Sequence, residues 1–415
     1  MKENILFILP GLPYPLKSGG HQAMYNSITA IRNDYNVFLA YDTWAEENSG
    51  NYEEEFSALF PEICLLPYRQ NAGSSLRDII VSGISKTAKA IYGKIKKKRK
   101  EFELCQKWIN DLWPRSDDWL SFIDRICTQN HFDIIQVEMP WMISQVLTLP
   151  KGPKKVFVHH ELGFVRRELE QNSVGGLQYY VKAYKSIADI VEVGLLNMYD
   201  SVITLSSDDA NKLIDKGVTI PVYPSFAVVD TKEFSPVFGD GTTLSFVGPD
   251  SHSPNLIGVL WFLENCWANL KNMNPNYNLQ IIGRWGDENK KAITEKYQDV
   301  RFLGFVDNLS ANLKGTVMIV PITIGSGIRM KILEACSIGV PFVSTTVGAE
   351  GLHVIDGEHC FIADKPNDFV EKIVQLQGID IQKKFVDNSN ALVKMYFSKD
   401  ALRDNRLSIY HDLNK

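Results

Sequence analysis

The chain has 415 residues, 45% of them hydrophobic and 22% charged, and its formal net charge is −5. This length predicts two or three globular domains, each able to bury a core without a metal or disulfide staple. The acidic balance excludes bulk binding of nucleic acid. The six cysteines show no metal-ligand spacing and no C-x-x-C pair, so we expect reduced thiols in a cytoplasmic protein.

Short apolar runs alternate with helical patterns through the first half of the chain. The run at residues 5–9 is too short for a signal peptide and ends at Pro10, and no apolar stretch is long enough to predict a membrane span. The alternation is typical of a parallel sheet with helices on its faces. The expected strands are 4–9, 36–41, 133–137, 155–159 and 201–204, and the expected helices 20–32 and 178–199.

Residues 76–128 depart from this alternation and are expected to be a mostly helical excursion. The basic run KIKKKRK at 94–100 lies beside apolar residues at helical spacing. A basic helix with an apolar stripe can lie on an anionic membrane, so 76–108 is a candidate for peripheral contact with the inner membrane face. The alternative is a solvated excursion whose apolar stripe packs on the first domain.

A second set of strands follows a linker rich in proline and turn residues at 220–241. We place the domain boundary near 225–238, which gives domains at 1–225 and 226–398 and a terminal helix within 399–415. Two copies of one architecture predict a ligand in the cleft between them. The expected strands of the second domain are 243–247, 279–282, 301–303, 317–320 and 341–344.

Residues 315–351, GTVMIVPITIGSGIRMKILEACSIGVPFVSTTVGAEG, carry the clearest functional pattern. An apolar strand leads into a glycine turn, a helix ending near Gly339 and a second strand, and such strand ends bind ligands in open α/β sheets. The free N–H groups of a helix start attract an anion. Gly327, Lys331 and Glu334 share one helical face, where a phosphate and a sugar hydroxyl would fit. The alternative is a surface Lys–Glu pair, worth about 0.2–0.5 kcal/mol.

Two other segments approach nucleotide-binding motifs, but each lacks a required glycine. Residues 11–18 approach a P-loop, but Leu16 stands where the second glycine is required, and residues 325–330 lack the third glycine of a dinucleotide fingerprint. No His/Asp/Glu cluster has metal spacing, so we expect neither a metal nor another cofactor. A metal-independent site for a diphosphate needs protein cations, which Arg284, Arg329 and Lys331 supply.

The pattern P-x3-GSGIRMKILEA-x3-G-x-P-x-V-x4-GAEGL resembles the donor-site signature of group-1, nucleotide-sugar-dependent glycosyltransferases of the retaining, family-four-like GT-B type. The resemblance implies two Rossmann-like α/β domains whose parallel sheets face each other across a cleft, and a terminal helix that returns to the first domain. Further segments match that family in order, at 7–20, 132–141, 156–161, 200–209, 246–255, 279–287 and 300–309.

The resemblance also implies an activity, the metal-independent transfer of a hexose, with retention, from a nucleoside-diphosphate sugar to a glycan or lipid-linked acceptor in cell-surface polysaccharide biosynthesis. The leaving diphosphate itself would accept the proton of the acceptor. Two rivals stay open: a nucleotide-sugar epimerase on the same scaffold, and a non-catalytic subunit that binds a sugar nucleotide or glycan.

The resemblance assigns donor-side roles in the second domain. Arg329 and Lys331 would stabilise the charge of the leaving diphosphate, and Glu334 would hold the ribose. The other donor-side residues line the phosphate pocket (Gly248, Arg284), meet the nucleobase through their backbone (Phe305, Val306) or form the glycine turn (Ser326, Gly327).

In the first domain the resemblance implies that Gly19 and Gly20 approach the phosphate and acceptor, and that a histidine contacts the donor sugar. We prefer His160 to His159, because it lies nearer the strand end, and Glu138 is a candidate for holding the acceptor hydroxyl. The chain departs from the family pattern twice. Ser326 replaces the first of two glutamates, and residues 249–255 lack the usual Arg/Lys pair.

Overall fold

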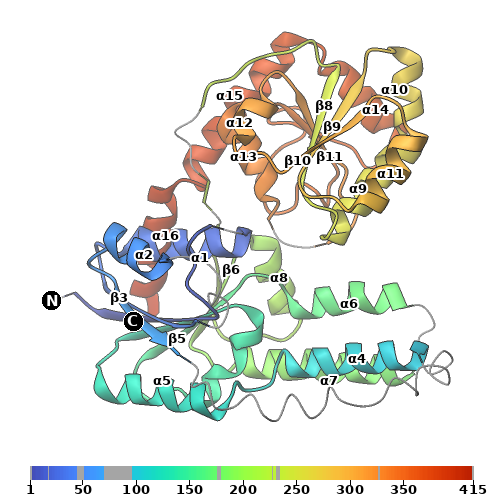
Figure 1. The fold of residues 1–415 in the computed structure, drawn as a ribbon. Coiled ribbons are helices and arrows are strands. Elements are labelled where there is room, and N and C mark those ends of the chain that lie inside the picture. Colours follow the sequence, from blue (N-terminus) through green and yellow to red (C-terminus); the bar gives the residue numbers. More distant parts are fainter. Residues whose placement is uncertain are drawn as a thin grey trace. The chain divides into compact units, whose positions relative to one another are not determined.

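The computed structural model describes residues 2–16, 18–43, 51–69, 96–174, 179–226, 228–229, 234–325 and 328–413, with 96–100 and 172–174 as backbone only. The chain forms two compact units (Figure 1). Unit 1 comprises Met1–Ser225 with Arg406–Lys415, and unit 2 comprises Phe226–Asn405.

Unit 1 is built on a seven-stranded sheet in the order β3-β2-β1-β4-β5-β6-β7, and each neighbouring pair is parallel. The central strands are buried on both faces, as parallel strands are when helices cover both sides. The strands are β1 (Asn4–Leu9), β2 (Asn36–Asp42), β3 (Cys64–Tyr68), β4 (Ile134–Glu138), β5 (Lys154–His159), β6 (Ser201–Thr204) and β7 (Val222–Pro224).

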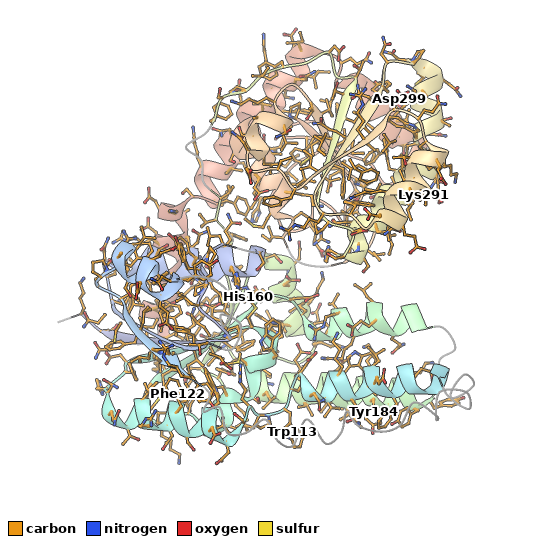
Figure 2. The ribbon with its side chains drawn as sticks, viewed as in Figure 1. Trp113, Phe122, His160, Tyr184, Lys291 and Asp299 are labelled. Atoms are coloured by element: carbon orange, nitrogen blue, oxygen red, sulfur yellow. The ribbon has the colours of Figure 1, made fainter. Side chains whose placement is uncertain are left out.

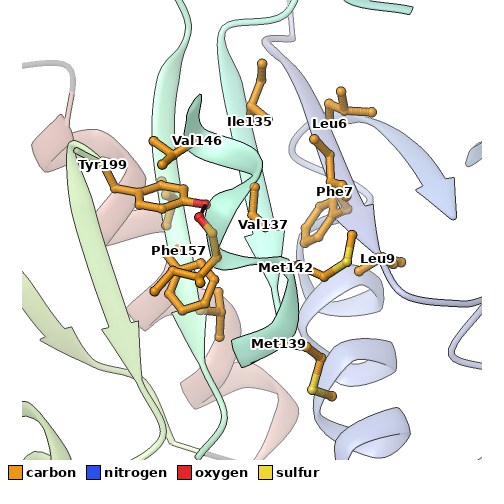
Figure 3. Packing of buried hydrophobic residues seen from close by; sticks show 14 of the residues in the cluster. Leu6, Phe7, Leu9, Ile135, Val137, Met139, Met142, Val146, Phe157 and Tyr199 are labelled. Atoms are coloured by element: carbon orange, nitrogen blue, oxygen red, sulfur yellow. Dashed lines mark hydrogen bonds between the residues drawn. The ribbon is translucent and has the colours of Figure 1, made fainter. Parts of the chain in front are cut away.

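The helices of unit 1 fill the connections between these strands. They are α1 (Gly19–Ile31), α2 (Tyr52–Leu59), α4 (Lys96–Asn110), α5 (Asp117–Gln129), α6 (Gly163–Val174), α7 (Tyr179–Leu196), α8 (Ser207–Asp215), a 3-10 helix η4 (Pro140–Thr148) and the last part of α16 (Lys399–Leu413). Figure 3 shows the core of this unit, where Val137 of β4 and Phe157 of β5 stand side by side on one face of the sheet and Tyr199 donates a hydrogen bond to the carbonyl of Ile143 at 2.8 Å.

Unit 2 repeats the architecture with six parallel strands in the order β10-β9-β8-β11-β12-β13. The strands are β8 (Thr243–Val247), β9 (Asn278–Ile282), β10 (Val300–Gly304), β11 (Val317–Val320), β12 (Phe342–Ser344) and β13 (Phe361–Ile362). The helices are α9 (Ser253–Asn265), α10 (Trp267–Met273), α11 (Asp287–Lys296), α12 (Leu309–Leu313), α13 (Met330–Ile338), α14 (Pro366–Gln375), α15 (Ile379–Tyr396) and the start of α16.

The predicted fold class of two parallel-sheet α/β domains is confirmed, with two corrections to individual elements. Residues 222–224 of the expected linker form strand β7, because they pair with β6. The helix of the glycine motif begins only at Met330, with Arg329 at its N-cap, and ends as predicted at Gly339 in the left-handed conformation. The helical excursion runs to Gln129 as α4 and α5, and its earlier part lies outside the described residues.

Each sheet has one topological switch point, where successive connections leave in opposite directions. In unit 1 the switch lies between β1 and β4, and in unit 2 between β8 and β11. Open α/β sheets bind ligands outside the carboxyl ends of the strands at such points. The residues that follow β4, β8 and β11 therefore occupy the positions best suited to a site. In the part of the chain that is described, no helix is both long and apolar enough to cross a bilayer.

Candidate active site

The switch point of unit 2 gathers a lysine, an asparagine and a bare backbone. The Nζ of Lys331, on α13, donates to Oδ1 of Asn255 on α9 at 2.7 Å, and lies 4.3 Å from the centre of the Phe246 ring on β8. Gly248 follows β8 with φ at +143°, and a Cβ there would lie 2.9 Å from that Nζ and 2.6 Å from Nδ2 of Asn255. Only glycine fits this position, because both the backbone angle and the space exclude a side chain.

The charge of Lys331 is held without a carboxylate partner among the described residues. No ion pair there joins it to Glu334, so the predicted alternative of a surface Lys–Glu pair does not describe this lysine. Burial and the nearby Arg329 lower the pKa of Lys331 to about 7, against the smaller opposing effect of Glu334. Burial raises the pKa of Glu334, with Lys331 opposing it. An anion beside Lys331 would favour its charged form.

A third basic group, which sequence reasoning missed, lies at the same place. His252 is the N-cap residue of α9, and its carbonyl accepts a hydrogen bond from the backbone N–H of Asn255 at 2.9 Å. Partial burial, Lys331 and Arg329 all lower the pKa of His252. It lies in the segment that lacks the family's Arg/Lys pair, and these neighbours favour the neutral form of its imidazole.

Arg329 is buried, with 8% of its surface exposed, at the N-cap of α13. The late start of that helix puts Lys331 in its first turn, so the backbone N–H groups of this turn and the lysine lie together. Gly325 before it has φ at +115°. The predicted donor residues Ser326 and Gly327 lie outside the described residues.

The loops after β8 and β9 are tied to one another. Nε1 of Trp285 donates to the carbonyl of Gly248 at 2.8 Å, and the carboxylate of Asp250 accepts from the N–H of Gly286 at 2.8 Å. A Cβ on Gly283 would lie 2.7 Å from the backbone of Gly248. These contacts fix the shape of the loop that carries Gly248.

Arg284 and Phe305 form the exposed side of this region. The guanidinium of Arg284 lies 5.4 Å from the Phe305 ring centre, within the range of a cation–π contact. Phe305 is 68% exposed, whereas Val306 packs against the core of unit 2. The structure thus brings Arg284 to Phe305, and no contact in the described residues joins it to Lys331.

In unit 1 the structure brings Glu138 and His160 together at the carboxyl ends of β4 and β5. Nε2 of His160 lies 2.5 Å from Oε2 of Glu138, and Oε1 of that carboxylate accepts from Nε2 of Gln136 at 2.5 Å. Glu138 is fully buried, so both its oxygens are engaged within the protein and an acceptor hydroxyl would have to displace one partner. Figure 2 shows His160 at this edge of unit 1.

The two adjacent histidines have different surroundings. His159 has no exposed side-chain surface, and its Nε2 bonds Glu192 of α7 at 2.9 Å. Burial opposes ionisation of Glu192, but hydrogen bonds and charge from His159 and Arg167 hold its pKa at about 2. His160 keeps 8% of its side chain exposed, and its Nδ1 has no hydrogen-bond partner in the described structure. Nδ1 of His159 also has no partner in the described structure, so the two histidines differ in exposure and in the carboxylate that holds them. The fully buried His159 fits a structural network, and the more exposed His160 is the better candidate for contact with a ligand.

Gly19 and Gly20 open α1, where the Ser18 hydroxyl caps the helix by accepting from the N–H of His21 at 3.2 Å. A Cβ on Gly20 would lie 2.7 Å from the methyl carbon of Met139, the residue after Glu138. Met139 itself has φ at +80°, a strained value for a side chain larger than glycine. The start of α1 therefore lies against the end of β4, at the switch point.

A cavity of about 470 Å³ also exists in unit 1, at the opposite edge of the sheet. Its lining includes Glu3, Asp133 and Lys154, which lie at the amino ends of their strands. Ligands of open α/β sheets bind at the other edge, so the cavity is not assigned to the site. In the described residues no group of three or more His, Cys, Asp or Glu side chains is placed to hold a metal ion.

Comparison with known proteins identifies the second half of the chain. Residues 241–378, which contain the whole Gly248–Lys331 cluster, match the family model of the glycosyl transferases group 1. This segment of unit 2 therefore resembles a group 1 glycosyl transferase domain. A curated relative is an uncharacterized 44.6 kDa protein in the cps region of Klebsiella pneumoniae, 24% identical over 275 residues, which are 63% of this chain and 69% of that protein.

Solved structures share the fold of this chain over nearly its whole length. Sucrose-phosphate synthase from Thermosynechococcus elongatus has a TM-score of 0.70 at 13% identity, covering 100% of this chain and 99% of that one. TarM has a TM-score of 0.67 at 12% identity, with 99% of both chains covered. HepE from Anabaena, solved with UDP, has a TM-score of 0.64 at 12% identity, covering 99% and 100%. The chain therefore has the GT-B fold.

Proposed function

We propose that this protein is a glycosyltransferase, which moves a sugar from a nucleoside-diphosphate donor to a glycan or lipid-linked acceptor, with retention at the anomeric carbon and without a metal ion. The observation that supports it best is the cluster of Lys331, Asn255 and Gly248 at the switch point of unit 2, where a partly buried cation has no carboxylate partner in the described structure. Of the relatives in fold, HepE was solved with UDP-glucose and a TarM variant from S. aureus with UDP and alpha-GlcNAc-glycerol.

The proposed chemistry assigns each charged group a task. In the transition state the bond to the diphosphate breaks, and negative charge grows on its oxygens. Lys331, Arg329 and the N–H groups at the start of α13 stabilise that charge, so they bind the transition state more tightly than the donor. The leaving diphosphate takes the proton of the acceptor hydroxyl, and Nδ1 of His160 contacts the donor sugar. Glu334 holds the ribose, and Phe305 and Val306 contact the nucleobase.

The proposal is tested by thermal-shift binding against a panel of nucleoside diphosphates with EDTA present. One base should raise the melting temperature, and Lys331→Ala should abolish that shift and the turnover. Lys291→Ala is the matched control, because this lysine lies in the same unit with 76% of its side chain exposed. A shift that needs added Mg²⁺ would refute the metal-free pocket. Tight donor binding without any turnover would favour the non-catalytic binding subunit instead.

We further propose that unit 1 meets an anionic membrane, which would bring it to a lipid-linked acceptor in polysaccharide synthesis, and the cps-region relative supports that setting. Most of the predicted segment 76–108 lies outside the described residues. The described part adds an apolar stripe on α7, which packs beside α4 and its sequence KKKRK. Six large side chains are exposed along one face of α7 and its end, namely Tyr179, Tyr180, Ile187, Ile190, Val191 and Met198.

An apolar face beside a basic run suits binding to acidic lipids. Sedimentation with vesicles of phosphatidylglycerol and phosphatidylcholine tests this contact. The protein should bind at low salt, and Ile187→Asp with Ile190→Asp should abolish binding while leaving turnover of a soluble acceptor unchanged. Equal binding to purely zwitterionic vesicles, or by the double variant, would refute it.

A further inference from the structure

A buried chain of hydrogen bonds connects the carboxy-terminal helix α16 to His160. The hydroxyl of Tyr410 donates to Oε1 of Gln136 at 2.6 Å, and Nε2 of Gln136 donates to Oε1 of Glu138 at 2.5 Å. The other carboxylate oxygen is 2.5 Å from Nε2 of His160. Tyr410, Gln136 and Glu138 have no exposed surface, so water does not compete for these bonds.

The donors and acceptors in this chain of hydrogen bonds can be assigned. Gln136 and Glu138 are two residues apart on β4, so their side chains stand on the same face of the strand. Burial raises the pKa of Tyr410 far above its usual range, so its hydroxyl stays protonated and can donate. Because Oε1 of Gln136 accepts from Tyr410, its NH₂ group faces Glu138. The carboxylate then accepts from both sides, and Nε2 of His160 must carry a proton.

This arrangement fixes the chemical state of the other imidazole nitrogen. With the proton on Nε2, Nδ1 of a neutral His160 is a hydrogen-bond acceptor, and this nitrogen has no partner in the described structure. The neighbouring His159 is held by Glu192 instead and has no connection to Tyr410 among the described contacts. Only one of the two histidines is therefore coupled to the terminal helix.

We propose that Tyr410 is a positioning residue, which acts through Gln136 and Glu138 to hold His160 in one tautomer and one orientation. The inference rests on the proposed contact of His160 with the donor sugar. It gives the returning segment of α16 a task in turnover as well as in folding. It also gives Glu138 a role different from holding the acceptor hydroxyl, because both its oxygens belong to this chain.

The variant Tyr410→Phe removes one hydroxyl and keeps the buried ring. We expect kcat to fall about 10-fold, which is the scale of one lost hydrogen bond, and its pH profile to move, with the KM for the donor unchanged. In a His160→Ala background the same substitution should not lower kcat further, because the group through which Tyr410 acts is then missing. Tyr35→Phe is the matched control. The centre of its ring lies 5.5 Å from that of Tyr410, edge-on, and it is not part of the hydrogen-bond chain.

A second readout does not depend on activity. Imidazole nitrogen NMR, with the His160 signals assigned by their loss in His160→Ala, should show Nε2 protonated in the wild type. Tyr410→Phe and Gln136→Met should both give a mixture of tautomers. An unchanged tautomer, or a loss of kcat that is equal with and without His160, would overturn the inference. Wild-type turnover in His160→Ala would instead overturn the proposed role of His160, and the NMR result would still decide the positioning.

Discussion

Replacing Lys331 by methionine should stabilise unit 2 near pH 6 while removing its affinity for a nucleoside diphosphate. The lysine is held by Asn255 and the face of Phe246, and no carboxylate in the described structure pairs with it. Folding therefore disfavours the charged form of Lys331, since its pKa falls from its ordinary 10.5 to about 7. Methionine keeps the length of the side chain and removes the charge.

The magnitude follows from the two pKa values of Lys331. At 1.36 kcal/mol per pKa unit, the difference between 10.5 and about 7 is an upper limit of about 5 kcal/mol. Below about pH 7 both the folded and the unfolded chain bind this proton, and the full cost is present. Between pH 7 and 10.5 the unfolded chain binds more protons, so stability rises with pH. At pH 9.5 only about 1 kcal/mol of the cost is left.

Scanning calorimetry of the full chain at pH 6 and pH 9.5 measures this difference. The hydrogen bond to Asn255 and the ring contact offset part of the gain, by about 1 kcal/mol each. The advantage of Lys331→Met should nevertheless shrink by about 3–4 kcal/mol between the two pH values, or roughly 6–15 °C in the melting temperature of unit 2. Lys291→Met, which replaces an exposed lysine on α11, should leave the melting temperature of unit 2 unchanged at both pH values.

A loss of stability in Lys331→Met that is equal at pH 6 and pH 9.5 would refute this reasoning. It would show that the contacts of charged Lys331 stabilise the free protein. The lysine would then serve folding rather than the binding of an anion.

Three further predictions follow from the same geometry. Binding of a nucleoside diphosphate at pH 8 should take up close to one proton at Lys331, seen as a dependence of the calorimetric enthalpy on the ionisation heat of the buffer; a buffer-independent enthalpy would contradict it. Gly248→Ala should abolish the nucleotide-induced thermal shift, because its Cβ would lie 2.6 Å from Asn255, and an undiminished shift would show that the loop yields. Glu192→Gln should cost up to about 3 kcal/mol at pH 7, a difference that shrinks as the pH falls from 4.5 towards 2, because the folded pKa of Glu192 is about 2; melting curves that are as far apart at pH 2.5 as at pH 7 would contradict this.

The local pattern of the sequence predicts the strands well. Buried parallel strands read as short apolar runs, and those of β1, β4, β8 and β11 lie where expected. The strand β7 was missed because Pro221 precedes it and Pro224 ends it, and because it gains its pairing only from β6. The start of α13 was placed too early, because helical periodicity extends through Ile328 and Arg329 although the backbone of Arg329 is not helical.

The residues of the candidate site were predicted one by one, and their contacts were not. The glycine motif indicated Lys331, and Glu138 was a candidate because a polar residue at a strand end marks the edge where ligands bind. Gly248 and His160 were indicated by the resemblance to a known family. Sequence alone gave no sign that Asn255 would hold Lys331, since 76 residues separate them. It likewise gave no sign of Tyr410, which reaches Gln136 across 274 residues.

By itself, then, the sequence determined two parallel α/β sheets and the loops at which chemistry is possible, because periodicity and glycine placement are local properties of the chain. Only the tertiary structure decided that Lys331 has no carboxylate partner among the described residues, that His159 is tied to Glu192, and that His160 is tied to Glu138. Hydrogen-bond partners and the pKa values they set depend on burial and on atoms brought close from distant segments, and no local pattern of residues contains that information.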